Sequence, residues 1–278
     1  MGAMTPRETI VITGASDGIG AAAARALAPD HDVVLVGRSP EKTAAVAREL
    51  GVPHHVADFA ELAQVRDLAA TLLAEYPRID VLANNAGGIM GDRQVTVDGF
   101  EKTFQVNHLA QFLLTDLLID RLTESNARVI QSASVAAKQW GRLDLDDLQN
   151  EKGYSPEKAY GDAKLANILF TRELQKRYGD RGITAASFHP GIVGTNFASD
   201  TTHVMRFAYH TPVIKNLVTI SPSKGADTLV WLATSTPGSD WEPGGYFAKR
   251  KPATSSRQST DMALAERLWD ISAELVGR

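Results

Sequence analysis

The 278-residue sequence contains no cysteine, which excludes disulfide bonds, thiol catalysis and thiolate metal sites. It has no apolar run that approaches the roughly 20 residues of a membrane span. Its opening residues, MGAMTPRETI, lack the basic segment followed by an apolar segment that is typical of a secretory signal. Basic residues are not in excess either, and the net charge is −4. We therefore expect a cytoplasmic protein whose main partner is neither nucleic acid nor membrane.

The composition is that of an ordinary globular protein, with 44% hydrophobic and 22% charged residues. No linker, low-complexity tract or fixed-period repeat divides the chain, so we expect one domain over residues 1–278. Residues 1–8 are expected to be disordered or tag-derived, because MGAM is typical of an expression scar.

Short apolar runs rich in β-branched residues alternate with longer helical patterns. Continuous apolar runs suit strands that are buried on both faces. Ser39-Pro40-Glu41 has the residues of a helix start. The alternation predicts an α/β fold, a single Rossmann-like doubly wound domain with a parallel sheet of about seven strands and helices on both faces. The predicted strands cover residues 9–14, 32–37, 53–58, 80–87, 128–134, 183–191 and 244–249.

Two stretches interrupt the alternation, and both follow predicted strands. Residues 140–158 are polar and rich in turn residues, and residues 194–221 begin as a Thr/Asn/Ser-rich loop. Ligands of open α/β sheets bind beyond the carboxyl ends of the strands, so both stretches are candidates for substrate contact.

A glycine-rich turn joins the first predicted strand to an Ala-rich helix in TIVITGASDGIGAAAARAL. Gly14 suits a tight exit from the strand, and Gly18 and Gly20 suit close approach of a ligand or of packed backbone. Amides at the start of the helix would face an anionic pyrophosphate. The alternative is a glycine-rich turn that binds nothing, but the strand-turn-helix context favours a dinucleotide site.

The second predicted strand ends at Gly37 and is followed by Arg38. Sites that select NAD usually carry an acid at this position, which contacts the ribose 2′-hydroxyl. The guanidinium of Arg38 instead suits a 2′-phosphate, which favours NADPH over NADH. A solvated arginine at a loop start is the alternative, and Asp17 in the glycine loop is unfavourable to a nearby phosphate.

Polar residues also end the fourth and fifth predicted strands. Asn84-Asn85-Ala86-Gly87 closes the fourth, Ser132 and Ser134 close the fifth, and Asn107 lies in a helical pattern. Each feature alone is more often a turn, a helix cap or a solvated side chain. Tyr160 and Lys164 are four residues apart and share one face of a predicted helix.

Taken together, these motifs resemble those of the short-chain dehydrogenase/reductase family. The matching elements are TGASDGIG at 13–20, Asp58, NNAG at 84–87, Asn107, Ser134, YGDAK at 160–164 and HPGIVGT at 189–195. The long interval between Ser134 and Tyr160 and the C-terminal segment resemble the retinol dehydrogenase-like branch, which bacterial antibiotic-pathway ketoreductases also resemble.

The chemistry of such a site needs a proton at the carbonyl oxygen that accepts a hydride from the cofactor. Tyr160 is the candidate general acid, and the charge of Lys164 would lower the pKa of its hydroxyl. Ser134 would hydrogen-bond the substrate oxygen, with Ser132 as second choice. The resemblance implies that Asn107 holds a water that links Lys164 to solvent. It also implies cofactor contacts from Gly14, Ser16, Gly18, Ile19, Gly20, Arg38, Asp58, Phe59, Asn85, Ala86, Gly87, Tyr160, Lys164, Pro190, Gly191, Val193 and Thr195.

Other polar or aromatic residues are weaker candidates. His54-His55 has no third ligand nearby, His108 lacks a serine and acid partner pattern, and an acidic turn at 144–147 reads as solvated, so no metal site is expected. Pocket-wall or packing roles are equally open for Trp140, Phe207, Tyr209 and His210.

The sequence thus predicts NADPH-dependent reduction of a ketone or aldehyde on a bulky, largely apolar small molecule. Oxidation of an alcohol with NAD or NADP is one alternative, and a dinucleotide-binding regulator without catalysis is another. A sugar-nucleotide epimerase or dehydratase is less favoured, because such chains usually carry a larger C-terminal substrate domain. A homo-oligomer that pairs through residues 158–178 stays open.

Overall fold

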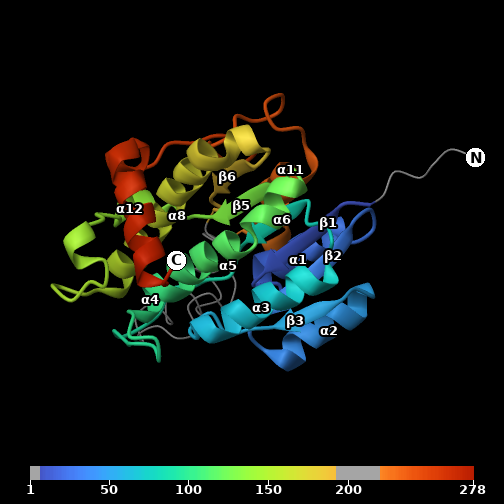
Figure 1. Ribbon diagram of the computed structural model, residues 1–278, viewed down its shortest axis with the longest axis horizontal. Helices are drawn as coiled ribbons and strands as arrows, with labels where there is room; N and C mark the ends of the chain where they lie inside the picture. The colour runs from blue at the N-terminus through green and yellow to red at the C-terminus, as the bar shows by residue number, and fades with distance from the viewer. Residues whose placement is uncertain (1–6, 192–219) are drawn as a thin grey trace, which may run out of the picture.

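The computed structural model describes residues 7–191 and 220–278 and contains one sheet flanked by helices (Figure 1). Strand order is β3-β2-β1-β4-β5-β6-β7-β8, in which the first seven strands are parallel and β8 runs antiparallel to β7. The strands are β1 (Thr9–Thr13), β2 (Asp32–Gly37), β3 (His54–Val56), β4 (Val81–Asn84), β5 (Arg128–Ser132), β6 (Thr184–Phe188), β7 (Tyr246–Ala248) and β8 (Lys251–Pro252).

The fold prediction is confirmed, since every predicted strand segment contains one of the strands β1 to β7. The order of the strands reverses between β1 and β4, which makes the sheet doubly wound. β8 was not predicted. It has only two residues and follows Lys249 and Arg250, which adopt positive φ angles of 51° and 58° and turn the chain back on β7.

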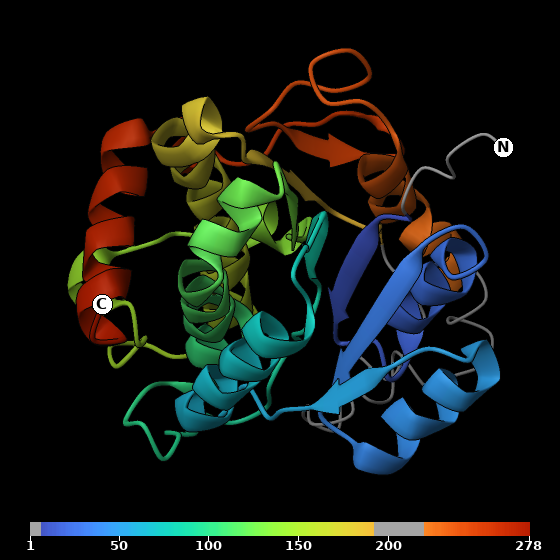
Figure 2. The ribbon, with the colours of Figure 1, turned by 45° about the vertical axis from the view of Figure 1, so that its right-hand side comes forward.

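Helices cover both faces of the sheet, as the oblique view in Figure 2 shows. One face carries α3 (Leu62–Glu75), α5 (Ala110–Leu117) and α8 (Pro156–Tyr178), and α12 (Met262–Leu275) packs on α8. The other carries α1 (Gly18–Leu27), α2 (Pro40–Leu50) and α11 (Pro222–Thr234). The shorter helices are α4 (Lys102–Phe104), η1 (Gln105–Leu109), α6 (Ile119–Glu124), α7 (Ala136–Gln139), η2 (Leu145–Asp147), η3 (Gly179–Arg181) and η5 (Arg257–Thr260).

The same local signal starts three of these helices. Ser39, Ser155 and Ser221 each cap a helix whose first residue is proline, and each side chain accepts a hydrogen bond from a backbone N–H one turn inside the helix. The helix start predicted at Ser39 is therefore confirmed. The serine at position 155 matters most, because α8 carries Tyr160 and Lys164.

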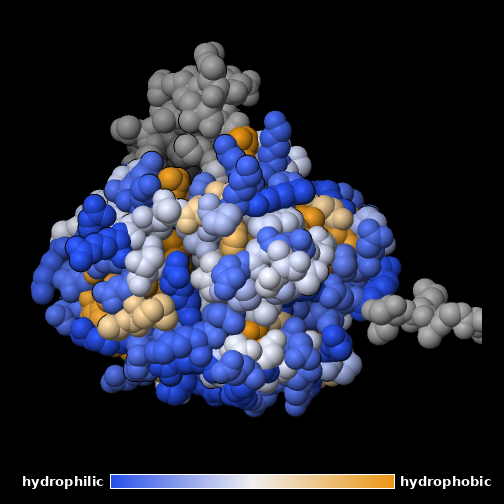
Figure 3. All heavy atoms as spheres, turned by 90° about the horizontal axis from the view of Figure 1, so that it is seen from above, coloured by the Kyte–Doolittle hydropathy of each residue, from blue (hydrophilic) through white to orange (hydrophobic). Residues whose placement is uncertain are grey.

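Most of α8 is buried within the chain. Its residues from Ala159 to Thr171 are all buried, and α12 packs against it (Figure 1). The face of α8 that lies under α12 is therefore already occupied. The face of the molecule seen in Figure 3 is mainly hydrophilic, and its apolar side chains lie in small separate spots. No described helix has the length and apolar character that crossing a membrane requires.

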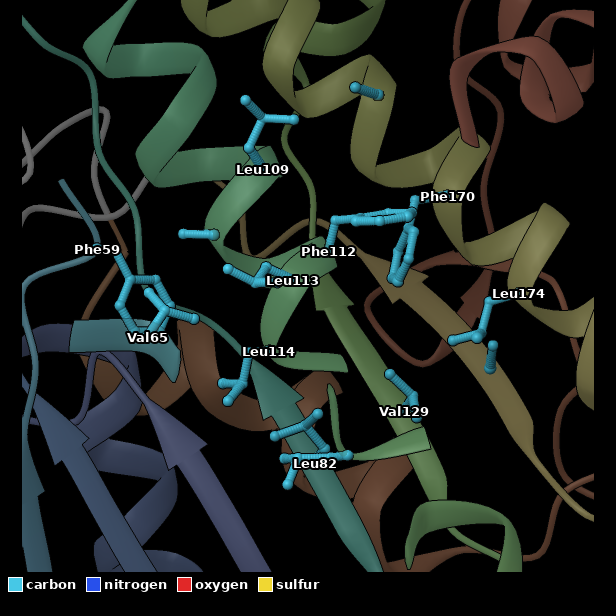
Figure 4. Packing of buried hydrophobic residues seen from close by; sticks show 14 of the residues in the cluster. Phe59, Val65, Leu82, Leu109, Phe112, Leu113, Leu114, Val129, Phe170 and Leu174 are labelled. Carbon is cyan, nitrogen blue, oxygen red and sulfur yellow. The ribbon is translucent and has the colours of Figure 1, made fainter. Parts of the chain in front are cut away.

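Aromatic packing defines the centre of the larger core (Figure 4). Phe112 of α5 is fully buried, and its ring lies 5.7 Å from that of Phe170 and 4.9 Å from that of Trp269, measured between centroids. These contacts connect α5 and α8 to α12. They hold in place the helix that carries the candidate catalytic pair.

Replacing Phe112 by alanine should therefore lower the free energy of unfolding by about 3–5 kcal/mol, because it removes buried surface and leaves a cavity. Chemical denaturation followed by circular dichroism measures this. Val97→Ala is the control, since Val97 is 84% exposed and should change stability by less than about 0.5 kcal/mol. Equal effects of the two substitutions would contradict the assignment of this core.

Candidate active site

A cavity of about 400 Å³ lies at the carboxyl ends of the parallel strands. Its lining comes from the segments that directly follow six of them, represented by Gly14, Arg38, Ala57, Asn85, Ser134 and Pro190. Tyr160 and Lys164 of α8 complete the lining. The cavity thus lies where ligands bind in open α/β sheets.

Most of the residues predicted for the site meet in this one cavity. They are Gly14, Ser16, Gly18, Ile19, Arg38, Asp58, Phe59, Asn85, Ala86, Gly87, Ser132, Ser134, Tyr160, Lys164, Pro190 and Gly191. Within the described part of the chain, Gly20 and Asn107 do not line it. Val193 and Thr195 lie outside the described residues, as do Phe207, Tyr209, His210 and nearly all of the predicted loop 194–221.

The glycine loop brings backbone close to the cavity. Gly14 has φ +67°, and a Cβ there would lie 2.8 Å from the Cα of Ala86, so the position requires glycine. Gly20 is buried and does not line the cavity, so the pyrophosphate contact that the resemblance implies for it stays a prediction. A Cβ on Gly20 would collide with the carbonyl of Gly14, so this glycine permits packing beneath the loop. Asp17 Oδ1 accepts a hydrogen bond from Gly18 N at 2.7 Å, so this carboxylate caps α1.

Hydrogen bonds tie together the ends of β1, β4 and β5. Thr13 Oγ1 accepts from the backbone N–H groups of Asn85 and Ala86, at 2.9 and 3.0 Å. Asn85 Nδ2 donates to the carbonyl of Thr13 at 3.0 Å, and its Oδ1 accepts from Ser132 Oγ at 3.1 Å. Phe59 also lines the cavity, but its side chain is only 4% exposed and packs mainly in the core. The strand ends that flank the cavity are therefore rigidly connected.

Asn107 supports the cavity from behind. It lies in η1, a π-helical turn, which is a rare form that often occurs at functional sites. Its Nδ2 donates to the carbonyl of Gly88 at 2.9 Å, and its Oδ1 accepts from Gly88 N at 3.1 Å. Asn107 therefore clamps the backbone that follows β4. The water-holding role implied by the family resemblance stays a prediction.

The Tyr160/Lys164 pair faces the cavity from α8. Lys164 Nζ lies 5.6 Å from the ring centroid of Tyr160 and donates a hydrogen bond to the carbonyl of Ser132 at 2.9 Å. The side chain of Lys164 is buried, and burial lowers the pKa of its ammonium to about 7. Gly87 approaches this group so closely that a Cβ there would lie 3.2 Å from Nζ.

The two candidate serines have different surroundings. Ser132 is buried, and its hydroxyl donates to Asn85. Ser134 is half-buried and lines the cavity, where its Oγ accepts from the backbone N–H of Ala136 at 3.2 Å. The Ser134 hydroxyl therefore keeps a proton to donate. This supports the choice of Ser134 over Ser132 for contact with a substrate oxygen.

Arg38 lines the cavity directly after β2, three strands away from β5 in the sheet, together with Lys42 from the first turn of α2. Neither cationic side chain forms a hydrogen bond or ion pair with another described residue. Lys42 was not predicted. Its position one turn into the helix that follows Arg38 is the signal that could have found it.

Several larger apolar residues also line the cavity. Ile89, Met90, Val106, Val135 and Trp140 line it, and of these only Trp140 was proposed from the sequence. The loop that carries Trp140 packs directly on α8, since a Cβ on Gly161 would lie 2.7 Å from Gly141 N.

Asp162 fixes the same loop to α8. It accepts a hydrogen bond from Arg142 N at 2.6 Å and pairs with Lys158 Nζ at 2.6 Å. Residues 140–158 were predicted to contact substrate, and of these Trp140 lines the cavity.

The weaker candidates lie elsewhere. His55 Nε2 is 3.2 Å from the hydroxyl of Tyr76, and His108 is buried against Ser272 Oγ at 2.9 Å. Asp147 accepts from two backbone N–H groups in its own turn. Within residues 7–191 and 220–278, no group of three or more His, Cys, Asp or Glu side chains has the geometry to hold a metal ion.

A doubly wound sheet with a glycine loop after β1 and a Ser/Tyr/Lys group near β5 defines a class of dinucleotide-binding oxidoreductases. Residues 8–205 match the short chain dehydrogenase family, and the chain belongs to this family. The fold of the family binds a nicotinamide dinucleotide. This confirms the resemblance on which the residue assignments depend.

Relatives extend over almost the whole chain. A putative daunorubicin C-13 ketoreductase of Streptomyces sp. (strain C5) is 45% identical over 280 residues, which cover 98% of this chain and 93% of that protein. Retinol dehydrogenase 12 of Mus musculus is 38% identical over 284 residues, 98% of this chain and 87% of its own. The crystal structure of an uncharacterized protein from Mycobacterium paratuberculosis has a TM-score of 0.78 and 33% identity, and the match covers 98% and 94% of the two chains.

The buried ammonium of Lys164 predicts a pH-dependent difference between wild type and Lys164→Met without cofactor. The pKa of Lys164 is about 7 in the folded chain and about 10.4 in the unfolded chain, so unfolding takes up a proton between these values. Stability of the wild type should therefore rise with pH relative to the variant, by up to about 1.4 kcal/mol per pH unit. Denaturation at pH 6, 7, 8 and 9 measures the difference. A constant difference from pH 7 to 9 would contradict this environment for Lys164.

Proposed function

We propose that this oxidoreductase uses NADPH to reduce a ketone or aldehyde on a bulky, largely apolar small molecule. The observation that carries the proposal is that Ser134, Tyr160 and Lys164 line the same cavity as Arg38, which follows β2, three strands away from β5 in the sheet. The cavity therefore presents proton-donating groups and a cationic group at separate places. The cationic group suits the 2′-phosphate of a phosphorylated dinucleotide, and the proton-donating groups suit a carbonyl that reacts at its nicotinamide.

The residues present fit a nicotinamide dinucleotide. Gly14 and Gly87 line the cavity without a side chain, so a ligand can approach the backbone there. The ammonium of Lys164 has three donors and uses one on Ser132 within the described residues. Ribose hydroxyls are acceptors of the kind that the remaining donors need. Arg38 and Lys42 together would hold a 2′-phosphate.

The bound cofactor supplies the hydride, and the chain supplies the proton and the electrostatic environment. Ser134 would donate a hydrogen bond to the substrate oxygen and stabilise the negative charge that develops on it. Tyr160 would give its hydroxyl proton to that oxygen. The carbonyl thus gains a hydride at carbon and a proton at oxygen, and Tyr160 is left as a phenolate. The charged form of Lys164 favours this phenolate, and acceptors around its ammonium favour that charged form.

The substrate class follows from the apolar residues that line the cavity. Ile89, Met90, Val106, Val135 and Trp140 offer an apolar surface of the kind that binds hydrocarbon rings or chains. Trp140 is 41% exposed although it is large and apolar, which suits a residue that contacts a ligand. The names of the relatives refer to daunorubicin and to retinol, which are both large molecules with extensive hydrocarbon parts.

Oxidation of an alcohol by the same residues is the main alternative, because each step is reversible. Arg38 and Lys42 favour reduction, since NADP is kept largely in its reduced form in cells and two cations at this end favour NADP(H). Tight binding of NADPH without turnover of any carbonyl compound or alcohol would favour a regulator instead.

Tyr160→Phe should lower kcat by at least about a thousandfold and leave the Kd for NADPH within about twofold, because it removes one proton donor and little surface. Tyr178→Phe, on the same helix but not at the cavity, is the control and should keep full activity. Steady-state kinetics and fluorescence titration give the two numbers. Full turnover by Tyr160→Phe would remove Tyr160 as the acid.

Arg38→Ala should weaken NADPH binding by about ten- to a hundredfold and NADH binding by less than about twofold, since charge-assisted hydrogen bonds to phosphate are lost. Arg48→Ala, an exposed position in the last turn of α2, is the control and should change neither. Quenching of tryptophan fluorescence measures both affinities. Equal losses for the two cofactors would exclude a phosphate contact for Arg38.

A further inference from the structure

A second cavity, of about 420 Å³, lies between α8, β7 and residues 253–260. The residues that line it include two arginines, Arg172 and Arg257, and a run of hydroxyl residues that includes Ser255 and Ser256. No Asp or Glu is among the described residues that line it. The cavity therefore has positive charge and hydroxyl donors without a compensating carboxylate.

Three polar atoms around this cavity are buried and have no hydrogen-bond partner among the described residues. They are Nε of Arg172 and the hydroxyl oxygens of Ser255 and Ser256. Arg172 also forms no ion pair within residues 7–191 and 220–278. Because most buried polar groups in proteins have partners, three such atoms around one cavity indicate that a ligand or water forms hydrogen bonds with them.

The chemistry of these atoms favours an anion over water. The guanidinium group has five donors and no acceptor, and it stays charged at any physiological pH. Burial lowers the pKa of Arg172 from its ordinary value, because desolvation penalises the charged form. An oxyanion would accept from the arginine and from both serine hydroxyls, and it would compensate the charge.

The cavity has fixed walls. Gln258 holds the 253–260 segment against the loop after β5, because its side chain donates to the carbonyl of Leu143 at 2.9 Å and accepts from Leu143 N at 3.1 Å. The Tyr246 side chain forms another wall, and its hydroxyl donates to the carbonyl of Ser134 at 3.3 Å. The segment that carries Ser255 and Ser256 is therefore attached to the rest of the fold through Gln258, which lowers the cost of ordering it when a ligand binds.

We propose that this cavity binds a phosphate-type oxyanion, either free phosphate or the phosphate group of a small metabolite. Arg172 provides the central cation, and Ser255 and Ser256 provide hydroxyl donors. The proposal does not depend on the hydride-transfer chemistry. Failure of either one leaves the other intact.

The test is binding of sodium phosphate to the cofactor-free protein, measured by thermal shift and calorimetry against sodium chloride at equal ionic strength. Wild type should be stabilised by phosphate and not by chloride. Arg172→Gln should weaken the phosphate Kd by at least about tenfold, because it removes a charged partner and its bidentate geometry. Glycerol 2-phosphate is tested in parallel, and tighter binding than phosphate would indicate a metabolite as the source.

Two control variants distinguish phosphate binding at this cavity from phosphate binding at other arginines. Arg38→Ala tests the dinucleotide cavity, and Arg48→Gln tests loss of charge at an exposed position. Both should keep the high-affinity phosphate binding. A double variant, Ser255→Ala with Ser256→Ala, keeps the charge of Arg172 and should also weaken binding, which provides a test if Arg172→Gln does not fold.

Retention of phosphate affinity by Arg172→Gln would overturn the proposal. So would the absence of a phosphate-specific shift in wild type, because the buried donors would then be satisfied by water alone.

Discussion

The hydrogen bond from the ammonium of Lys164 to the carbonyl of Ser132 is the contact on which the site depends. It joins α8 to the end of β5 and holds the buried ammonium group close to the backbone of Gly87. A Cβ at Gly87 would lie only 3.2 Å from Lys164 Nζ. Burying an ammonium with one acceptor is unfavourable, which is why its pKa falls to about 7. Further acceptors there would restore its charge. Because burial disfavours the charged ammonium and further acceptors favour it, Lys164 suits a site in which a bound ligand supplies those acceptors.

The fold could be predicted because its strands are continuous apolar runs that end in glycine or polar residues. Segments such as DVVLVG are apolar at every central position, which is typical of strands that are buried on both faces of the sheet. Because such strands alternate with helices, the sheet is expected to be parallel. β8 escaped prediction because two exposed residues carry no periodic signal, and its pairing follows from the turn at Lys249 and Arg250. The packing of α12 on α8 depends on aromatic contacts far apart in sequence, such as Phe170 with Trp269.

The site was predictable where parallel strand ends bring residues together, as for Asn85, Ser134 and Arg38. It was less so where a helix or loop folds back. Lys42 lines the cavity from α2, whereas Asn107 clamps the backbone at Gly88 and Gly20 packs beneath the glycine loop. The second cavity left no motif in the sequence. Its serines lie in an ordinary turn-rich stretch, and Arg172 lies two helical turns, about 12 Å, beyond Lys164 on α8.

We propose that one cavity combines a phosphorylated nicotinamide dinucleotide with a proton donor for a carbonyl substrate. The most direct measurement follows the loss of reduced-nicotinamide absorbance when the wild-type protein, NADPH and a panel of bulky ketones are mixed. NADH is compared under the same conditions. We expect NADPH to be oxidised at a rate well above that of NADH, with one alcohol formed for each NADPH consumed. No oxidation of either cofactor by any ketone or aldehyde, despite tight binding, would contradict it.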